Sequence, residues 1–453
     1  MFSLLKFSIG AALLSSSAIA SATSFVVLGE TGANLDAAVV AAGGTIKKRL
    51  RGIDAVVAEG GTDFLSRIAT KAGVASAAAD VKIDWQPKDR NVEFSEDNAV
   101  NPPNNPPGTI DRFFNLQWGH TAVKAVDAWH LGYEGQGARV AVLDGGFQLA
   151  HPDMAGRFDP ACTADMTGEG IEYGSNSDDL SGIFSHGMHT AGTVGAARNN
   201  IGTIGVAPRA TLCLVKVLFN SGSGSFEDVA EGIVFAADRN VDVISMSLGG
   251  AIQKSSPGAS TLRSLIDRAV SYAYKRGALV IASAGNDGAS ADSPKISGTP
   301  ADLIHLPSDS PQAISISATA PRGWANAPNN TFLDNPASYT NYGRSVINLA
   351  APGGDFDPSI TGRCTIGGVT QACPVFDLVF STGARNRFYW SAGTSMATPH
   401  VSGVAALIVS KHGKMHPAKL RAYLNGGADD LGATGRDPYY GQGRVNALRS
   451  VSQ

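Results

Sequence analysis

The 453-residue sequence has no long run of basic residues, and its formal net charge is only −3. Proteins that bind nucleic acids or anionic membranes through electrostatics carry a basic patch or stripe. The sequence therefore gives no indication of a nucleic-acid partner, nor of a charged membrane surface as a binding partner.

Cysteine is also scarce. Four cysteines are too few to hold a chain of this length together as a disulfide-dense scaffold, although their even number suits two bridges in an oxidising compartment. With 43% hydrophobic and 17% charged residues, the chain is able to bury one large core or to form two to three domains. We expect a globular protein.

Long apolar runs are missing apart from the N-terminus. Residues 1–7 carry one cation, Lys6; a short apolar run follows, and small residues at 18–22 offer cleavage sites. This order is typical of a secretory signal peptide. A membrane anchor is disfavoured because the run falls short of the ~20 residues that a bilayer requires. We predict a signal peptide at residues 1–22, no membrane span elsewhere, and a secreted protein that is extracellular or periplasmic.

Residues 23–86 have the pattern of a small α+β unit in the order β-α-β-β-α-β. The predicted strands are 24–28, 45–51, 55–58 and a weak final one, and the predicted helices are 34–42 and 62–72. This order is typical of a ferredoxin-like unit, which carries no chemistry by itself. Residues 87–110 follow as a Pro-rich linker, which we expect to be extended, exposed and open to proteolysis.

Residues 111–453 alternate between short apolar strands and helical segments. The predicted strands are 138–143, 212–217, 241–246, 278–283 and 313–317. Strands that are uniformly apolar are buried on both faces, which predicts an α/β fold with a predominantly parallel sheet flanked by helices. In such sheets functional residues collect at the carboxyl ends of the strands.

Three polar residues stand at a strand end or a helix start. Asp144 ends the first strand, His186 begins a helix of small residues, and Ser395 begins a strongly apolar helix whose N-terminal N–H groups would stabilise negative charge. Taken singly, Asp144 and Ser395 are better explained as helix caps, which is the commonest use of such residues. His186 and His189 lack the spacing and the intervening Glu of a helical zinc motif, so a metal site is disfavoured.

Taken together, these positions resemble the subtilisin-like serine proteases. The order is Asp, His, Ser, and the resemblance covers roughly residues 117–451. The motifs that carry it include Ser185-His186-Gly187-Met188-His189, Gly393-Thr394-Ser395-Met396-Ala397-Thr398-Pro399, His151-Pro152-Asp153, Gly205-Val206-Ala207-Pro208, Ser247-Leu248-Gly249-Gly250, Ala284-Gly285-Asn286 and Ala351-Pro352-Gly353.

The resemblance implies a role for each catalytic residue. Ser395 is the nucleophile, His186 takes its proton, and Asp144 holds the imidazole tautomer. The Asn286 amide and the Ser395 backbone N–H are the expected oxyanion donors. No cofactor is implied for the chemistry. A structural calcium ion is left open, because Asp153 matches a family ligand while the loop at 198–202 is one residue short.

Peptide binding in the resemblance uses two extended edges, between which a substrate lies as an added strand. The residues implied are Gly222, Ser223, Gly224, Ser247, Leu248, Gly249 and Gly250. Ala284 and Gly285, with a segment near His305, would form the pocket for the residue before the cut. We expect that pocket to prefer an apolar side chain.

The cysteines suit two bridges. Cys364 and Cys373 flank a Gly-Gly turn and are able to pair locally, which leaves Cys162 with Cys213. The alternative for Cys213 is a buried apolar thiol, given its strand position.

The leading hypothesis is a secreted, monomeric serine endopeptidase made as a proenzyme. The resemblance implies that residues 23–86 are an inhibitory propeptide that assists folding and is then cut off, near residues 84–86 or within the linker. One alternative is a catalytically silent binding or chaperone module of the same fold. An α/β-hydrolase esterase is rejected, because those enzymes run Ser, acid, His and place the serine in Gly-x-Ser-x-Gly.

Overall fold

The structure, a computed structural model, describes residues 24–94, 111–174, 181–292 and 303–453. The predicted signal peptide and the Pro-rich centre of the linker lie outside the described residues. No helix within the described ranges combines the length and the apolarity that crossing a membrane requires.

The N-terminal unit has the predicted element order. It comprises β1 (Ser24–Gly29), α1 (Leu35–Ala41), β2 (Thr45–Leu50), β3 (Ala55–Glu59), α2 (Phe64–Ile68) and β4 (Val74–Ala79). The strands form an antiparallel sheet in the order β2-β3-β1-β4. Helix α2 is shorter than predicted because the chain turns after Ile68, where the Thr70 hydroxyl bonds the Arg67 carbonyl and Gly73 follows in a left-handed conformation.

The central sheet confirms the predicted α/β fold. Its strands are β7 (Arg139–Asp144), β8 (Ala164–Asp165), β9 (Thr211–Lys216), β11 (Val243–Met246), β13 (Leu279–Ser283), β15 (Ile314–Ala320), β16 (Asn335–Pro336) and β17 (Ile347–Pro352). Their order is β16-β15-β13-β11-β7-β9-β8, with β17 also beside β15. Every pair is parallel except β15–β16, so the carboxyl ends of the main strands share one edge.

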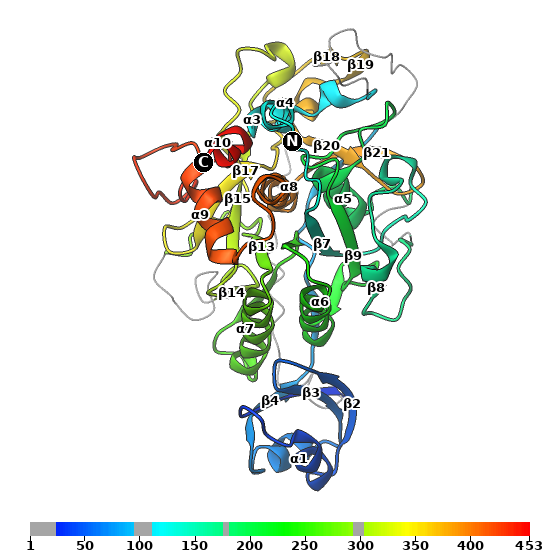
Figure 1. The fold of residues 1–453 in the computed structure, drawn as a ribbon, viewed down its shortest axis with the longest axis vertical. Helices are drawn as coiled ribbons and strands as arrows, with labels where there is room; N and C mark the ends of the chain where they lie inside the picture. The colour runs from blue at the N-terminus through cyan, green and yellow to red at the C-terminus, as the bar shows by residue number, and fades with distance from the viewer. Residues whose placement is uncertain (1–23, 95–110, 175–180, 293–302) are drawn as a thin grey trace, which may run out of the picture.

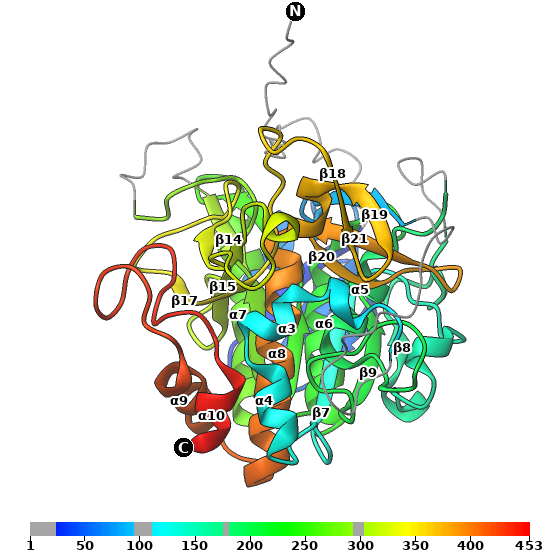
Figure 2. The same cartoon turned by 90° about the horizontal axis from the view of Figure 1, so that it is seen from above.

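Helices cover both faces of this sheet. Val140 and Val142 of β7 pack into the core beneath α5 (His186–Gly195) and α8 (Thr394–His412), whereas Ala141 and Leu143 pack beneath α6 (Phe226–Asp238) and α7 (Ala259–Lys275). Burial on both faces explains why these strands are uniformly apolar. Figure 1 shows α6 and α7 between the sheet and the N-terminal unit, and Figure 2 shows α8 running across the opposite face.

The remaining helices and strands lie outside the central sheet. They are β5 (Lys82–Asp84), β6 (Arg90–Glu93), α3 (Trp118–Ala122), α4 (Ala125–His130), β10 (Ser223–Ser225), β12 (Gly250–Gln253), β14 (Leu303–Leu306), β18 (Arg363–Ile366), β19 (Val369–Ala372), β20 (Val379–Thr382), β21 (Phe388–Ala392), α9 (Pro417–Gly427) and α10 (Ala447–Ser452). Short 3₁₀ turns lie at Phe114–Leu116, Pro152–Met154, Pro160–Cys162, Trp324–Asn326 and Cys373–Asp377.

Both predicted cysteine pairs are bonded in the structure. Cys162 joins a 3₁₀ turn to Cys213 of β9, with the two Cα atoms 5.0 Å apart. Cys364 and Cys373 link the β18–β19 hairpin to the turn that follows it, with a Cα separation of 4.9 Å. Cys213 is therefore bonded and is not a free buried thiol.

The start of the predicted linker differs from expectation. Residues 87–94 are not a free connection, because Arg90–Glu93 pairs as β6 with β21 and the Phe94 side chain is buried, although Lys88, Arg90, Asn91 and Glu93 are exposed as expected. The sequence pattern missed this strand because its pairing partner lies about three hundred residues away and local polarity gives no sign of such pairing.

Candidate active site

The acid and the base come from two elements that meet at the carboxyl edge of the sheet. Asp144 is the last residue of β7 and is fully buried. Its Oδ1 lies 2.6 Å from His186 Nδ1 and accepts the Gly145 N–H at 2.7 Å. The Thr190 hydroxyl, one helical turn beyond His186, donates to Asp144 Oδ2 at 3.0 Å. Helix α5 therefore supplies both the base and a group that orients its carboxylate partner.

The electrostatic environment of His186 differs from that of its helical neighbour. Burial disfavours the imidazolium, but the carboxylates of Asp144 and Asp89 outweigh it and raise the pKa of His186 to about 10. At His189, which faces no carboxylate, burial lowers the pKa to about 3. Paired carboxylates thus distinguish the candidate base from a histidine that is merely buried.

Ser395 is the second residue of α8 and is buried. Its hydroxyl donates to the Ser247 carbonyl at 3.1 Å, and the Ser247 hydroxyl donates to the Ser395 carbonyl at 2.7 Å. This reciprocal pair anchors the nucleophile to the segment that follows β11. Ser247, predicted only as a peptide-binding residue, therefore also positions Ser395.

Asn286 has a fixed orientation. Its Oδ1 accepts both the backbone N–H and the hydroxyl of Thr394, at 2.9 and 2.8 Å. With the carbonyl side of the amide occupied in this way, Nδ2 points toward the reaction centre, where it donates to Asp89 Oδ1 at 2.9 Å. The amide donor thus faces the space that the predicted oxyanion would occupy.

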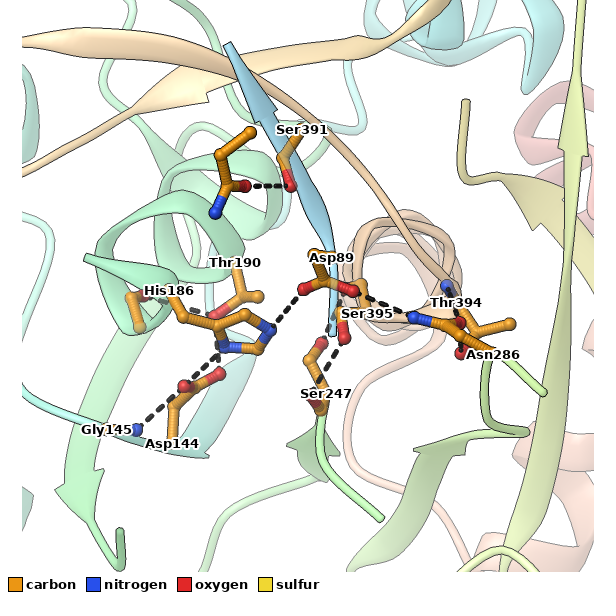
Figure 3. A network of polar contacts seen from close by, with 12 residues as sticks. Asp89, Asp144, Gly145, His186, Thr190, Ser247, Asn286, Ser391, Thr394 and Ser395 are labelled. Carbon is orange, nitrogen blue, oxygen red and sulfur yellow. Dashed lines mark hydrogen bonds and ion pairs between the residues drawn. The ribbon is translucent and has the colours of Figure 1, made fainter. Parts of the chain in front are cut away.

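Asp89 was not predicted, yet it stands at the centre of the site. Figure 3 shows its carboxylate between His186 and Asn286, beside Ser395. Oδ2 lies 3.0 Å from His186 Nε2, and the side chain is only 1% exposed. Burial raises the pKa of Asp89, while contacts with His186, Asn286 and Ser395 oppose the rise. A Cβ at Gly393 would collide with this carboxylate, which makes the glycine a spatial requirement here.

No local signal marks Asp89. An aspartate in a polar, Pro-rich stretch is usually exposed to solvent. The residues that Asp89 contacts lie about one hundred to three hundred residues further along the chain. The one unusual residue nearby is Trp85, a large aromatic side chain in an otherwise polar stretch.

The two edges predicted to bind peptides hold the protein's own chain. Strand β5 pairs antiparallel with β10, whose register sets Ser223 opposite Asp84 and Gly224 opposite Ile83. Beyond it, the Trp85 N–H donates to the Gly222 carbonyl at 3.1 Å, and its carbonyl accepts the Gly249 N–H at 2.8 Å. Backbone hydrogen bonds from both edges therefore hold an extended chain between them, as expected of an added strand.

Trp85 anchors this segment. Its buried ring meets Phe226 edge-on at 4.8 Å, and its Nε1–H donates to the Gly224 carbonyl at 3.0 Å. A Cβ at Gly250 would lie 2.6 Å from the Ile83 side chain, so a glycine is needed for the close approach. Leu248 is buried in the same cluster as Trp85.

Beyond Asp89, the chain continues along the other side of the cleft. Strand β6 pairs antiparallel with β21, and the Ser391 hydroxyl donates to Asn91 Oδ1 at 2.7 Å. Phe94 then packs edge-on against Phe113, Phe380 and Trp390. Segments on either side of Asp89 are thus both held by strand pairing and an aromatic anchor.

The predicted pocket residues lie beside the nucleophile. The Gly285 N–H donates to the Thr394 hydroxyl at 3.1 Å, and Ala284 is the first residue after β13. A Cβ at Gly285 would lie 3.3 Å from His305 Nδ1, and His305 Nε2 is 3.9 Å from Asp287 Oδ2. The side chains near Gly285 therefore include polar groups, and the expected apolar preference of this pocket stays a prediction.

The residues around Asp153 do not fit calcium. One carboxylate oxygen already accepts the Thr203 N–H and hydroxyl, and the loop turns the N–H groups of Asn199 and Asn200 toward Asp111. A calcium site needs six to eight oxygen ligands, whereas this loop presents donors. Within the described residues, no group of three or more His, Cys, Asp or Glu side chains is arranged to hold a metal.

Comparison with known proteins places this geometry in a family. Residues 135–443 match the Subtilase family, Peptidase_S8. Thermitase of Thermoactinomyces vulgaris is 34% identical over 340 residues, which cover 75% of this chain and 97% of that protein. Subtilisin E of Bacillus subtilis (strain 168) is 34% identical over 332 residues, which cover 73% of this chain and 70% of that protein.

Solved structures show the same fold. The epidermin leader peptide processing serine protease of Staphylococcus aureus superposes with a TM-score of 0.72 at 18% identity, over 95% of this chain and 97% of that one. Fervidolysin of Fervidobacterium pennivorans, a keratinolytic enzyme related to subtilisin, gives 0.68 at 22% identity, over 95% of this chain and 61% of that one. The match to the family over residues 135–443, together with relatives that are 34% identical over about three quarters of this chain, shows that the protein belongs to the subtilase family and is a subtilisin-like serine endopeptidase.

Proposed function

We propose that this protein is a secreted serine endopeptidase that acts through Asp144, His186 and Ser395 and is made as a self-processing proenzyme. The observation that carries the proposal is the buried 2.6 Å pair between Asp144 Oδ1 and His186 Nδ1, beside a serine at the start of a buried helix. Strong pairing to a buried acid fixes the tautomer that leaves Nε2 facing the nucleophile.

In this mechanism a substrate peptide replaces the segment around Asp89. Its scissile carbonyl lies where the Asp89 carboxylate now lies, and the Ser395 hydroxyl attacks the carbonyl carbon as His186 Nε2 takes the proton. The carbonyl oxygen becomes an oxyanion that accepts hydrogen bonds from Asn286 Nδ2 and from the N-terminus of α8. His186 then gives the proton to the departing amine, and water hydrolyses the acyl-enzyme by the reverse sequence.

The enzyme needs no cofactor for this chemistry, since the base, the acid and the oxyanion donors are all side-chain or backbone groups of the chain. Its substrates are polypeptides, bound as an added strand between Gly222–Gly224 and Gly249. The presence of Trp85 in the aromatic pocket beside Phe226 favours a large apolar residue at that position of a substrate.

The N-terminal unit is the intramolecular inhibitor in this proposal, and the processed enzyme acts as a monomer. Support comes from the position of residues 82–93, which occupy the cleft on both sides of the reaction centre. A catalytically silent module remains the alternative, but the ordered Thr190 and Thr394 contacts have a clear purpose only if Asp144 and Asn286 must be oriented for catalysis.

The test is to treat the purified protein with a fluorophosphonate and map the adduct by peptide mass spectrometry. We expect a single adduct on Ser395 that disappears in Ser395→Ala. An adduct that persists in that variant, or its absence from every processed and unprocessed form of the wild-type chain, would refute the proposal.

A further inference from the structure

The carboxylate of Asp89 contacts three of the four proposed catalytic groups. It pairs with His186 Nε2 at 3.0 Å, accepts the Asn286 amide at 2.9 Å, and lies beside the Ser395 side chain (Figure 3). Each contact uses an atom that catalysis requires: the proton-accepting nitrogen, the oxyanion donor and the nucleophile. A side chain that only filled space would not need to satisfy all three.

The position of Asp89 is set from both sides. Strand β5 and Trp85 fix the chain before it, while β6 and Phe94 fix the chain after it. Gly393 lacks the Cβ that would exclude the carboxylate. The placement therefore follows from two strand pairings and two aromatic anchors, and a shift of either strand by one residue would turn the side chain to the opposite face.

His186 is unable to act as a base while this pair exists. If the imidazole holds the proton, Nε2 already carries hydrogen. If Asp89 holds it, its Oδ2 still covers the Nε2 lone pair at a distance of 3.0 Å. In both cases the nitrogen is engaged, and the Ser395 hydroxyl donates instead to the Ser247 carbonyl.

The group at the oxyanion position is also unreactive. Asn286 donates to a side-chain carboxylate oxygen, and a carboxylate resists nucleophilic attack because it already carries the negative charge that attack would create. Burying the negative charge of Asp89 costs free energy unless the carboxylate has partners. His186 and Asn286 are the partners that stabilise it here. Asp89 thus imitates the charge of the transition state without offering a bond to cleave.

We propose that Asp89 is the autoinhibitory residue of the unprocessed chain, where its side-chain carboxylate occupies the oxyanion position and engages the proton-accepting nitrogen of His186. This inference rests on the proposed function, since it names the residue that silences the same site. The N-terminal unit, β5 and β6 position Asp89 in the cleft, and the Asp89 carboxylate inhibits the catalytic groups.

The experiment measures how fast fluorophosphonate labels the full-length band of freshly purified chain, resolved by gel from processed forms. Asp89→Ala and Asp89→Asn are compared with the wild type, and Asp84→Asn serves as the control because Asp84 is an exposed acid in the same segment. Loss of a charge-assisted contact predicts labelling about ten- to hundredfold faster for Asp89→Ala. Asp89→Asn, which keeps the shape of the side chain, should also label faster, and Asp84→Asn should match the wild type.

The outcomes separate the two proposals. Equal labelling rates for the full-length wild type and both Asp89 variants, with Ser395 labelled in the processed enzyme, would overturn the role of Asp89 and leave the protease function standing. The same is true if Asp84→Asn accelerates labelling as much as the Asp89 variants, since strand binding alone would then explain inhibition. Absence of a Ser395 adduct from every form would instead refute the protease function itself.

Discussion

At the scale of single residues, the active site is oriented by short polar contacts that reach across elements. Thr190 donates to the carboxylate of Asp144, Thr394 donates to the amide oxygen of Asn286, and Ser247 holds Ser395, the proposed nucleophile. None of these three contacts touches the expected position of the scissile bond. Their effect is to restrict each catalytic group to one rotamer, which is the usual condition for electrostatic stabilisation without reorganisation.

Replacement of Asn286 by alanine removes the side-chain oxyanion donor. We expect kcat for peptide hydrolysis to fall about 10²–10³-fold with little change in KM, a magnitude measured for this donor in subtilisin and used here by analogy. Steady-state kinetics on a peptide substrate check this. A rise in KM at constant kcat would instead assign Asn286 to ground-state binding.

Replacement of Thr190 by valine leaves one oxygen of a fully buried carboxylate without its hydroxyl donor. Hydrogen bonds to charged groups contribute ~1.5–3 kcal/mol, so kcat should fall about ten- to hundredfold. The pH profile of kcat/KM should also move, because Asp144 is then less well fixed against His186. Thr193→Val, one turn further along α5 and bonded to the His189 carbonyl, is the matched control. Equal losses in both variants would point to helix stability instead.

The residues that could be predicted are those with their own local signature. Asp144, His186, Ser395 and Asn286 each stand in a short motif at a strand end or helix start, so sequence order and neighbours sufficed to propose them. Thr190 and Thr394 are missed as orienting groups because a threonine in a helix has many uses. Asp89 is missed because its role arises only when residues far apart in the sequence meet in the cleft.

At the scale of elements, the contact between the N-terminal unit and helix α6 contains a perturbed acid. Burial raises the pKa of Asp80 to about 8, aided by Glu227 and Asp228 and opposed by the N–H groups of Glu227 and Phe226 at the start of α6. Lys48 also faces this region and pairs with Glu231 at 2.6 Å. The ordinary pKa of Asp80 is 3.8, so the docked unit holds a proton that the free unit releases.

The sign of the pH effect follows from this raised value. Docking is favoured most strongly below about pH 4, weakens as the pH rises toward about 8, and becomes constant above it. We expect the thermal midpoint of the unprocessed Ser395→Ala chain to fall relative to its Asp80→Asn derivative over that range, because asparagine imitates the protonated acid. Midpoints measured by circular dichroism that run parallel at every pH would contradict this assignment.

Strands could be predicted where both of their faces are buried, because such burial requires a continuous run of apolar residues. The five main strands lie within a few residues of their predicted positions, since their composition reflects the helices on both sides of the sheet. Strands β5 and β6 were not predicted. They are short and polar, and they exist because β10 and β21 offer edges for them to pair with, which no local pattern encodes.

At the scale of the whole molecule, one chain contains both the cleft and the segment that fills it. The N-terminal unit packs against α6 and α7, and the chain leaving it crosses the carboxyl edge of the sheet before the protease domain begins (Figure 1). In the proposed function, the inhibitory segment and the enzyme are therefore made in equal number.

The central claim is that Ser395 is the nucleophile with which this chain cleaves polypeptides, including itself. The direct measurement is a time course of intact mass and casein hydrolysis for the purified wild type and for Ser395→Ala. We predict that the wild type shortens from its N-terminus and gains activity as it does so, while Ser395→Ala stays full length and inactive until wild-type enzyme is added to cleave it. Self-shortening and casein hydrolysis by Ser395→Ala at the wild-type rate would contradict the account.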